Sequence, residues 1–195
     1  MAEDAEIKPI DNTEPEETPG YVPPAEKTID EITKLDQDDE SLVKYKQALL
    51  GAASGDAAPA DDPRKVVVQK MMLVSEDRTD IVLDLTGDLS KLPPMTVKEG
   101  VEYKIKIEFK IQHEIVSGLR YHHTVSRKSM NVDKQTYMVG SYGPRAEPHL
   151  WTSPSDEAPK GLIARGHYKI KSKFIDDDKN VHLQWEWSMD IKKDW

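Results

Sequence analysis

Residues 101–115, VEYKIKIEFKIQHEI, alternate two kinds of side chain along their whole length. One set of alternate positions is mostly apolar, and the other is charged or polar. The first set is Val101, Tyr103, Ile105, Ile107, Phe109, Ile111, His113 and Ile115. A period of two is typical of a β-strand with one buried and one solvated face. An unbroken strand would span roughly 50 Å at about 3.4 Å per residue, so we expect a bend or bulge to divide it.

Further short segments with strand patterns lie on both sides of this stretch. Turn sequences such as TGD, EG, SGL, GPR and DDDKN separate them. The segments are residues 66–74, 80–85, 118–125, 135–142, 166–174 and 183–189. Strands at this spacing without helices between them predict an antiparallel β-sandwich. Its Lys-rich outer faces would discourage pairing between edges of different molecules.

The last of these segments, LQWEWSM at 183–189, poses a packing question. Leu183, Trp185, Trp187 and Met189 share its apolar face. Two tryptophans on one face occupy a large volume for a single strand of a small domain. They either fill an ordinary core or wall a cavity meant for another molecule.

The charge of the chain is concentrated at its N-terminal side. Residues 1–62 hold 17 acidic against 5 basic residues, a net charge of −12, and residues 63–195 hold 19 against 22, a net charge of +3. A strongly acidic arm argues against nucleic acid as the main partner and suits a basic protein surface, although acidic tails also serve solubility alone. The 195 residues include no cysteine, which fits a cytosolic protein, and we find no secretory signal and no membrane span.

The acidic arm has three parts. Residues 1–27 are rich in Glu, Pro and Thr and predict a disordered tail. TIDE at 28–31 fits a capping box, and Asp38 or Asp39 can cap a second helix, so we expect a helical hairpin over residues 28–51. The apolar stripe of the second helix is Leu42, Tyr45 and Leu49. Such short helices are not stable alone, so the hairpin either packs on its own domain or becomes ordered against a partner. Residues 52–64 form a small-residue linker.

Motifs for catalysis, cofactors and metals are absent from the sequence. There is no phosphate-binding glycine loop, no zinc-binding H-E-x-x-H and no nucleophile elbow. His122 and His123 are adjacent on a strand and face opposite sides, so they do not chelate a metal. The DDDK at 176–179 is an acidic turn that lacks calcium-loop spacing. A carbohydrate hydrolase would need two carboxylates that face each other across a cleft, whereas the acids here lie on polar strand faces. We therefore expect no enzyme, no cofactor and no metal site.

Seven stretches, in order along the chain, resemble Rho GDP-dissociation inhibitors. They are LDQDDESLVKYKQALLG (35–51), LDLTGDL (83–89), KEGVEYKIKIEF (98–109), EIVSGLRY (114–121), DKQTYMVGSYGPRAE (133–147), EAPKGLIARGHYKIKSKFIDDDK (157–179) and LQWEWSMDIKKDW (183–195). The resemblance runs from about residue 21 to the end. The extreme N-terminus, the linker 52–64 and the loop 75–80 depart from the family pattern, and SKLPPM at 90–95 is shorter and richer in proline.

The resemblance implies both a fold and a function. The fold is all-β, an immunoglobulin-like antiparallel β-sandwich over residues 65–195, with a prenyl-binding slot between its sheets and a flexible N-terminal arm before it. The function is that of a cytoplasmic inhibitor, without a cofactor or stable membrane insertion. It is a monomer alone and forms a 1:1 complex with a geranylgeranylated Rho-family GTPase in the GDP state. It blocks GDP release through the arm and extracts the GTPase from membranes by taking up the lipid tail.

The resemblance also implies three groups of site residues. Contact with the GTPase switch regions falls to Asp38, Asp39, Ser41, Leu42, Tyr45 and Asp178, with Asp39 accepting a hydrogen bond from a switch threonine. The prenyl slot is lined by Leu73, Met95, Tyr103, Ile115, Tyr142, Ile170, Trp185 and Trp187, where Met95 replaces an aromatic residue. An acidic patch for the basic tail of the GTPase comprises Glu157, Asp176 and Asp177.

Two rival functions stay open at this point. One is a structural β-sandwich with a regulatory tail and no lipid slot. The other is a general carrier of prenylated proteins that ignores the nucleotide, which would need the slot but not an arm that reads the switch regions.

Overall fold

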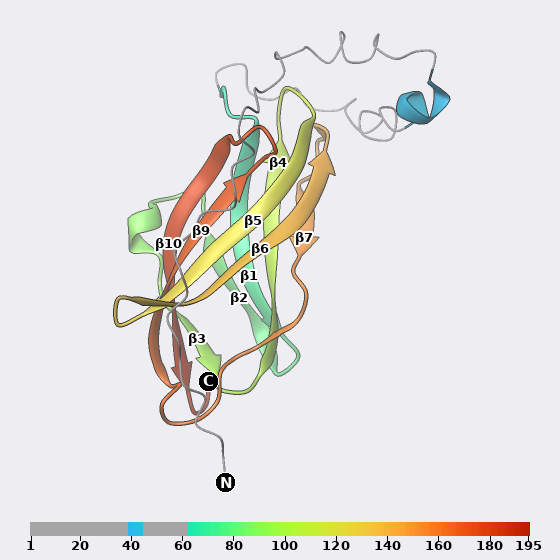
Figure 1. Cartoon of the computed structure of the whole chain (residues 1–195). Helices are drawn as coiled ribbons and strands as arrows, with labels where there is room; N and C mark the ends of the chain where they lie inside the picture. The colour runs from blue at the N-terminus through green and yellow to red at the C-terminus, as the bar shows by residue number, and fades with distance from the viewer. Residues whose placement is uncertain (1–38, 45–61) are drawn as a thin grey trace.

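The computed structural model describes residues 39–44 and 62–195. Within residues 62–195, ten strands form two sheets. The two sheets face each other (Figure 1). The first sheet has the order β2 (Arg78–Asp84), β1 (Val66–Ser75), β4 (Glu102–Ile111) and β7 (His149–Thr152), with β8 (Asp156–Glu157) paired to β4. The second has the order β3 (Met95–Lys98), β10 (Val181–Lys192), β9 (Gly166–Ile175), β5 (Val116–Arg127) and β6 (Met130–Tyr142). A short 3-10 helix, η1 (Leu89–Lys91), precedes β3. The predicted all-β sandwich is therefore confirmed.

The core lies between the two sheets because each strand turns its apolar face inward. In β4, Ile105, Ile107, Phe109 and Ile111 are buried, while the lysines and glutamates between them are more exposed. Phe109 in the first sheet packs against Phe174 in the second, with ring centroids 5.2 Å apart. Burial of such side chains contributes about 1.5–3 kcal/mol each and is the main force that holds the sheets together.

The long alternating stretch is divided, as expected, but the division changes which side chains point inward. The strand β4 ends at Ile111, and His113 has a positive φ of 66°. Gln112 is buried instead, and its Nε2 donates to the carbonyl of Arg64 at 2.8 Å. The prediction that His113 faces inward is wrong, because the chain leaves the first sheet here and His113 is exposed. Ile115 lies on the link to β5 and is half-buried.

One strand pair departs from the antiparallel expectation. The short strand β3 runs parallel to β10, with Met95 beside Met189. Every other strand pairing within residues 62–195 is antiparallel. The strands β3, β7 and β8 were not predicted, because segments of four residues or fewer are too short to show a period of two.

The described part of the arm is one helical turn, residues 40–44. Asp39 caps it, since its Oδ1 accepts the backbone N–H of Ser41 at 2.9 Å and that of Leu42 at 3.2 Å. The predicted start of the second helix at Asp38 or Asp39 is thus confirmed for Asp39. The predicted tail 1–27, the first helix, Asp38, Tyr45 and most of the linker 52–64 lie outside the described residues.

Different backbone contacts close the two ends of the sandwich. At one end, which we call the arm end, the carbonyl of Lys65 accepts the backbone N–H of Gln112, and the carbonyl of Ser117 accepts that of Asp177. At the other, which we call the opposite end, Val101 and Ala158 meet through a backbone hydrogen bond of 2.9 Å. The strand β4 runs from the opposite end to the arm end.

At the arm end, Gly118→Ala is expected to lower the free energy of unfolding by about 2–3 kcal/mol. Gly118 has a φ of +61°, and a Cβ there would lie 1.8 Å from Oδ2 of Asp177. The left-handed conformation alone costs an alanine roughly 1–2 kcal/mol, and the added methyl would also displace Asp177 from Arg120. Urea denaturation measures the change. Gly87→Ala is the matched control, because no atom lies within 4 Å of its Cβ position; equal losses in the two variants would contradict this account.

Candidate functional site

A polar group sits in the middle of the apolar interior of the second sheet. Ser172 on β9 is completely buried. Its Oγ accepts the indole N–H of Trp187 at 2.9 Å and lies 3.0 Å from the hydroxyl of Tyr121. This hydrogen-bonded line crosses β10, β9 and β5 and fixes the orientation of both rings. Burial raises the pKa of Tyr121 well above its usual range, so its hydroxyl is protonated at neutral pH.

Aromatic rings form a continuous path from this interior to one edge of the sandwich. Tyr121 lies 6.0 Å from Trp185 and 5.8 Å from Trp151, measured between ring centroids. Trp151 lies 5.9 Å from Tyr137, and His123 lies 6.0 Å from Tyr137. Trp185 is buried, whereas Trp151 on β7 and Tyr137 on β6 are half-exposed. We call these five residues the aromatic path; β6 and β7 are the edge strands at its outer end.

Two polar atoms of the aromatic path have no hydrogen-bond partner among the described residues. They are Nε1 of Trp185 and Nδ1 of His123, and both are buried. Burial lowers the pKa of His123, so its ring is neutral at neutral pH. Unpaired buried polar atoms are rare in folded proteins and commonly mark a bound water or a functional position. The aromatic path is therefore the part of the interior in which buried polar atoms lack hydrogen-bond partners among the described residues.

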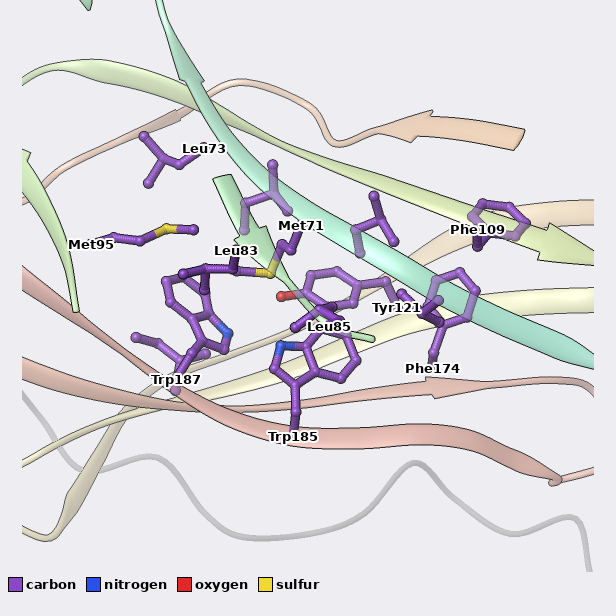
Figure 2. Packing of buried hydrophobic residues seen from close by; sticks show 14 of the residues in the cluster. Met71, Leu73, Leu83, Leu85, Met95, Phe109, Tyr121, Phe174, Trp185 and Trp187 are labelled. Atoms are coloured by element: carbon purple, nitrogen blue, oxygen red, sulfur yellow. The ribbon is translucent and has the colours of Figure 1, made fainter. Parts of the chain in front are cut away.

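The predicted lining residues occupy this interior, but not as a single cluster. Five of them are buried in the core: Leu73, Met95, Ile170, Trp185 and Trp187. Figure 2 shows both tryptophans pointing from β10 into the space between the sheets, toward Met71, Leu83 and Tyr121. Ile170 lies directly across from Trp187 in the strand pairing. These residues share one interior.

The other three predicted lining residues lie toward the two ends of the sandwich, Tyr103 at one end and Tyr142 and Ile115 at the other. Tyr103 is near the opposite end, and its hydroxyl donates to Asp156 at 3.3 Å. Burial and the Asp156 carboxylate raise its pKa far above the usual range. Tyr142 packs edge-on against Phe109 at 5.1 Å, toward the arm end. Ile115, on the link between β4 and β5, is half-buried and is not among the residues of the core cluster.

Carboxylates lie near the outer end of the aromatic path. The hydroxyl of Tyr137 donates to Oε1 of Gln135 at 2.6 Å, and Nε2 of Gln135 donates to Asp133 at 3.2 Å. Burial raises the pKa of Tyr137, and the charges of Asp156 and Asp133 raise it further. Glu157 is exposed and follows Asp156 in β8. We call Asp133, Asp156 and Glu157 the acidic rim. Of these three residues, only Glu157 was predicted from the sequence.

The acidic turn between β9 and β10 lies at the arm end, away from Glu157 at the opposite end. Asp176 is buried, and its carboxylate accepts hydrogen bonds from His182 and from the backbone and side chain of Asn180. Burial alone would raise the pKa of Asp176, but these hydrogen bonds outweigh it and lower the pKa. Asp176 therefore stabilises its own turn and is not part of an exposed acidic patch, contrary to the prediction.

Asp177 and Asp178 remain at the surface of that turn. Asp177 is about half exposed and pairs with Arg120 at 2.5 Å. Asp178 is half-buried. Both lie at the end of the sandwich where the arm joins, so they are separated from the acidic rim by most of the length of β4.

Sequence reasoning missed Tyr121, His123, Tyr137, Trp151 and Ser172. The alternation in GLRYHHTV places Tyr121 and His123 on one face, and this signal was present. It correctly separated His122 from His123, since the first is half-exposed and the second is buried. Trp151 lies in a four-residue strand without a readable pattern, and Ser172 is a small polar residue in a Lys-rich strand, so neither carried a signal.

Other types of site have less support in the described structure. Among residues 39–44 and 62–195, no group of three or more His, Asp or Glu side chains is arranged to hold a metal ion. None of the helices in these ranges is long and apolar enough to cross a membrane.

The structure thus defines an immunoglobulin-like β-sandwich with an aromatic path into its interior and acids at its rim. A family model described as "RHO protein GDP dissociation inhibitor" matches residues 6–194. "Rho GDP-dissociation inhibitor 1" of Homo sapiens is 52% identical over 187 residues, which cover 95% of this chain and 91% of the human protein. "Rho GDP-dissociation inhibitor 3" of Bos taurus is 48% identical over 185 residues, which cover 92% and 80%. The chain belongs to the Rho GDP-dissociation inhibitor family, a family of GTPase regulators.

One solved structure has a distantly similar sandwich. A Niemann-Pick type C2 protein from the Japanese carpenter ant has a TM-score of 0.44 and 9% identity, and the match covers 71% of this chain and 100% of that protein.

Proposed function

We propose that this chain binds geranylgeranylated Rho-family GTPases in the GDP state, blocks GDP release and extracts the GTPases from membranes. It acts in the cytoplasm as a monomer and forms a 1:1 complex with its partner. The proposal includes no catalytic residue, no cofactor and no nucleic-acid partner. The observation that carries it is the aromatic path from the β6–β7 edge to Trp185.

The interior supplies the burial that a lipid tail requires. A geranylgeranyl chain has about 20 carbons, and each CH₂ removed from water contributes about 0.8 kcal/mol at most. Leu73, Met95, Ile170 and Trp187 offer apolar side chains, and the half-exposed rings of Trp151 and Tyr137 lie on the way in. The rings would separate slightly to admit the chain. Nε1 of Trp185 and Nδ1 of His123 lie along this route without a hydrogen-bond partner among the described residues.

The acidic rim suits the polypeptide next to the lipid. The resemblance implies a basic tail on the GTPase, and Asp133, Asp156 and Glu157 lie where that tail would leave the sandwich. Such contacts at a solvated rim mainly speed association and set register. In this proposal, Asp177 and Asp178, at the arm end, contact the body of the GTPase together with the arm.

The arm would contact the switch regions and so make binding depend on the nucleotide that the GTPase holds. Asp39, Ser41 and Leu42 form the first turn of a short helix, and the Leu42 side chain is 42% exposed. An exposed leucine beside a capping aspartate gives an apolar anchor and a hydrogen-bond acceptor on one small surface. Asp38 and Tyr45 complete the proposed contact. A general prenyl carrier would not need this surface.

Extraction of a prenylated GTPase from vesicles tests the function as a whole. Vesicles loaded with a geranylgeranylated Rho-family GTPase are mixed with the protein and sedimented, and release of bound fluorescent GDP is followed in parallel. We expect the GTPase–GDP to move to the supernatant with its GDP retained. Extraction without any slowing of GDP release would favour the general carrier, and no extraction would favour a structural sandwich.

Reversing the charge of the acidic rim should weaken binding of the basic lipidated tail. For Asp156→Lys with Glu157→Lys, we expect about five- to tenfold weaker binding of a geranylgeranylated basic peptide at low salt, because attraction becomes repulsion at a solvated site. The difference should shrink as salt is raised. Glu76→Lys, in the exposed β1–β2 turn, is the control. Equal effects of the rim and control variants would remove the rim from the account.

A further inference from the structure

Two large aliphatic side chains are held out into solvent at the tip of one loop. Leu162 is 81% exposed and Ile163 is 59% exposed. Met130, at the start of β6 and beside the β5–β6 turn, is 50% exposed. These residues, with Arg127, Lys128 and Val132, line a hollow of about 430 Å³. We call Met130, Leu162, Ile163, Arg127, Lys128 and Lys160 the apolar-basic edge.

The loop that carries Leu162 and Ile163 is braced rather than loose. The backbone N–H of Gly161 donates to Glu99 at 2.9 Å, and Arg165 forms an ion pair with Glu99 at 2.5 Å. The Arg165 guanidinium holds the pKa of Glu99 at about 2, so this brace persists at all physiological pH values.

The β5–β6 hairpin is tied to the same loop. Arg127 donates to the carbonyl of Arg165 at 2.6 Å and lies over the ring of Tyr168, 5.2 Å from its centroid. Tyr168 in turn donates to the carbonyl of Ala164 at 2.6 Å. These contacts position the backbone yet leave the aliphatic side chains outside the core. A braced loop that displays apolar side chains is a typical interaction site.

The charged residues around Leu162 and Ile163 indicate what kind of partner this edge would bind. No acidic residue occurs in residues 126–132 or 158–167, although the whole chain has a net charge of −9. Since Glu99 neutralises Arg165, the basic groups beside the aliphatic tips are Arg127, Lys128 and Lys160. Aliphatic tips flanked by lysine and arginine are the chemistry that inserts into the headgroup region of anionic bilayers. A second copy of this chain fits poorly, because a two-fold contact through this edge would bring its bases together.

We propose that the apolar-basic edge contacts anionic lipid membranes directly, in the protein without any bound GTPase. Leu162 and Ile163 enter the boundary between headgroups and acyl chains, and Arg127, Lys128 and Lys160 meet the lipid phosphates and carboxylates.

Flotation of the full-length protein with vesicles tests this proposal. Vesicles of phosphatidylcholine alone are compared with vesicles that also contain phosphatidylserine. We expect binding that depends on phosphatidylserine, falls about tenfold when Leu162→Ser is combined with Ile163→Ser, and falls about fivefold or more for Lys128→Glu. The control combines Met138→Ser with Leu150→Ser, which are 60% and 55% exposed elsewhere on the sandwich; it should bind like the wild type.

Several results would overturn the proposal. They are no binding of the wild type to either vesicle, equal binding to both, or the same loss in the edge and control variants. Analytical ultracentrifugation adds one more: a wild-type dimer that becomes monomeric with Leu162→Ser and Ile163→Ser would assign the edge to a second copy. Because no GTPase is present, failure here leaves the proposed inhibition and extraction untouched.

Discussion

Asp39→Ala is expected to weaken inhibition of GDP release roughly 5- to 150-fold while leaving binding of a geranylgeranylated C-terminal peptide nearly unchanged. Removing a hydrogen-bond acceptor from a dehydrated contact costs about 1–3 kcal/mol, which corresponds to that range in affinity. The peptide never touches the switch regions, so its affinity depends on the sandwich alone. Release of a fluorescent GDP analogue and a peptide titration measure the two quantities.

Asp39 also has a structural role, which the experiment must distinguish from its proposed contact with the switch region. Its Oδ1 also caps the helix that begins at residue 40, and loss of a cap typically costs about 1 kcal/mol. Asp39→Ser is the matched control, because serine caps a helix well but carries no carboxylate. If Asp39→Ser restores full inhibition, capping explains the effect and the switch contact does not. If Asp39→Ala weakens peptide binding as much as GDP retention, the proposed division of labour between arm and sandwich is wrong.

The lipid tail is expected to supply at least a thousandfold of the affinity for the GTPase. Full burial of about 20 carbons at about 0.8 kcal/mol each sets the upper limit of the free energy gained. A quarter of that limit is about 4 kcal/mol, which corresponds to roughly a thousandfold in affinity. The measurement compares binding of the same GTPase–GDP with and without its geranylgeranyl group. A difference below about tenfold would mean that the sandwich interior is an ordinary core.

The outer end of the aromatic path offers a variant for the same experiment. Trp151→Ala should weaken binding of the prenylated GTPase because Trp151 links Tyr137 to Tyr121 across the sheets. Trp195→Ala is the matched control: Trp195 is also half-exposed, but it packs under Arg78 at 4.8 Å and makes no ring contact with the path. Only the first variant should lose affinity for the prenylated form, and neither should alter binding of the unprenylated form.

The sequence predicted the long strands well because an alternation over ten or so residues leaves few alternatives. It predicted Trp185 and Trp187 on one inward face, and both are buried. It also predicted a cap at Asp38 or Asp39, because a cap is a local contact, and Asp39 is the cap. The turn at Gln112 and His113 was harder to predict, because a histidine with positive φ and a buried glutamine contradict the local pattern. Contacts to Arg64 and Asp62, which are remote in sequence, hold both residues in place.

The site was only partly predictable because it combines residues that are remote in sequence. Tyr137, Trp151 and Asp156 come together at one edge through the pairing of sheets, which no periodicity encodes. Asp176 shows the converse: in the sequence it resembles its exposed neighbours, and burial plus three internal hydrogen bonds distinguish it. Charge in a turn therefore does not reveal which carboxylates face solvent.

The indole N–H signals of the four tryptophans provide the most direct test of a lipid slot in this sandwich. In a nitrogen–proton correlation spectrum, the Trp187 N–H is hydrogen-bonded to Ser172, whereas the Trp185 N–H has no acceptor among the described residues. Adding a geranylgeranylated C-terminal peptide should shift the signals of Trp185 and Trp187 in a saturable way and leave Trp195 unchanged, and the same peptide without its lipid should shift neither. Signals of Trp185 and Trp187 that stay in place while the lipidated peptide binds would contradict the account.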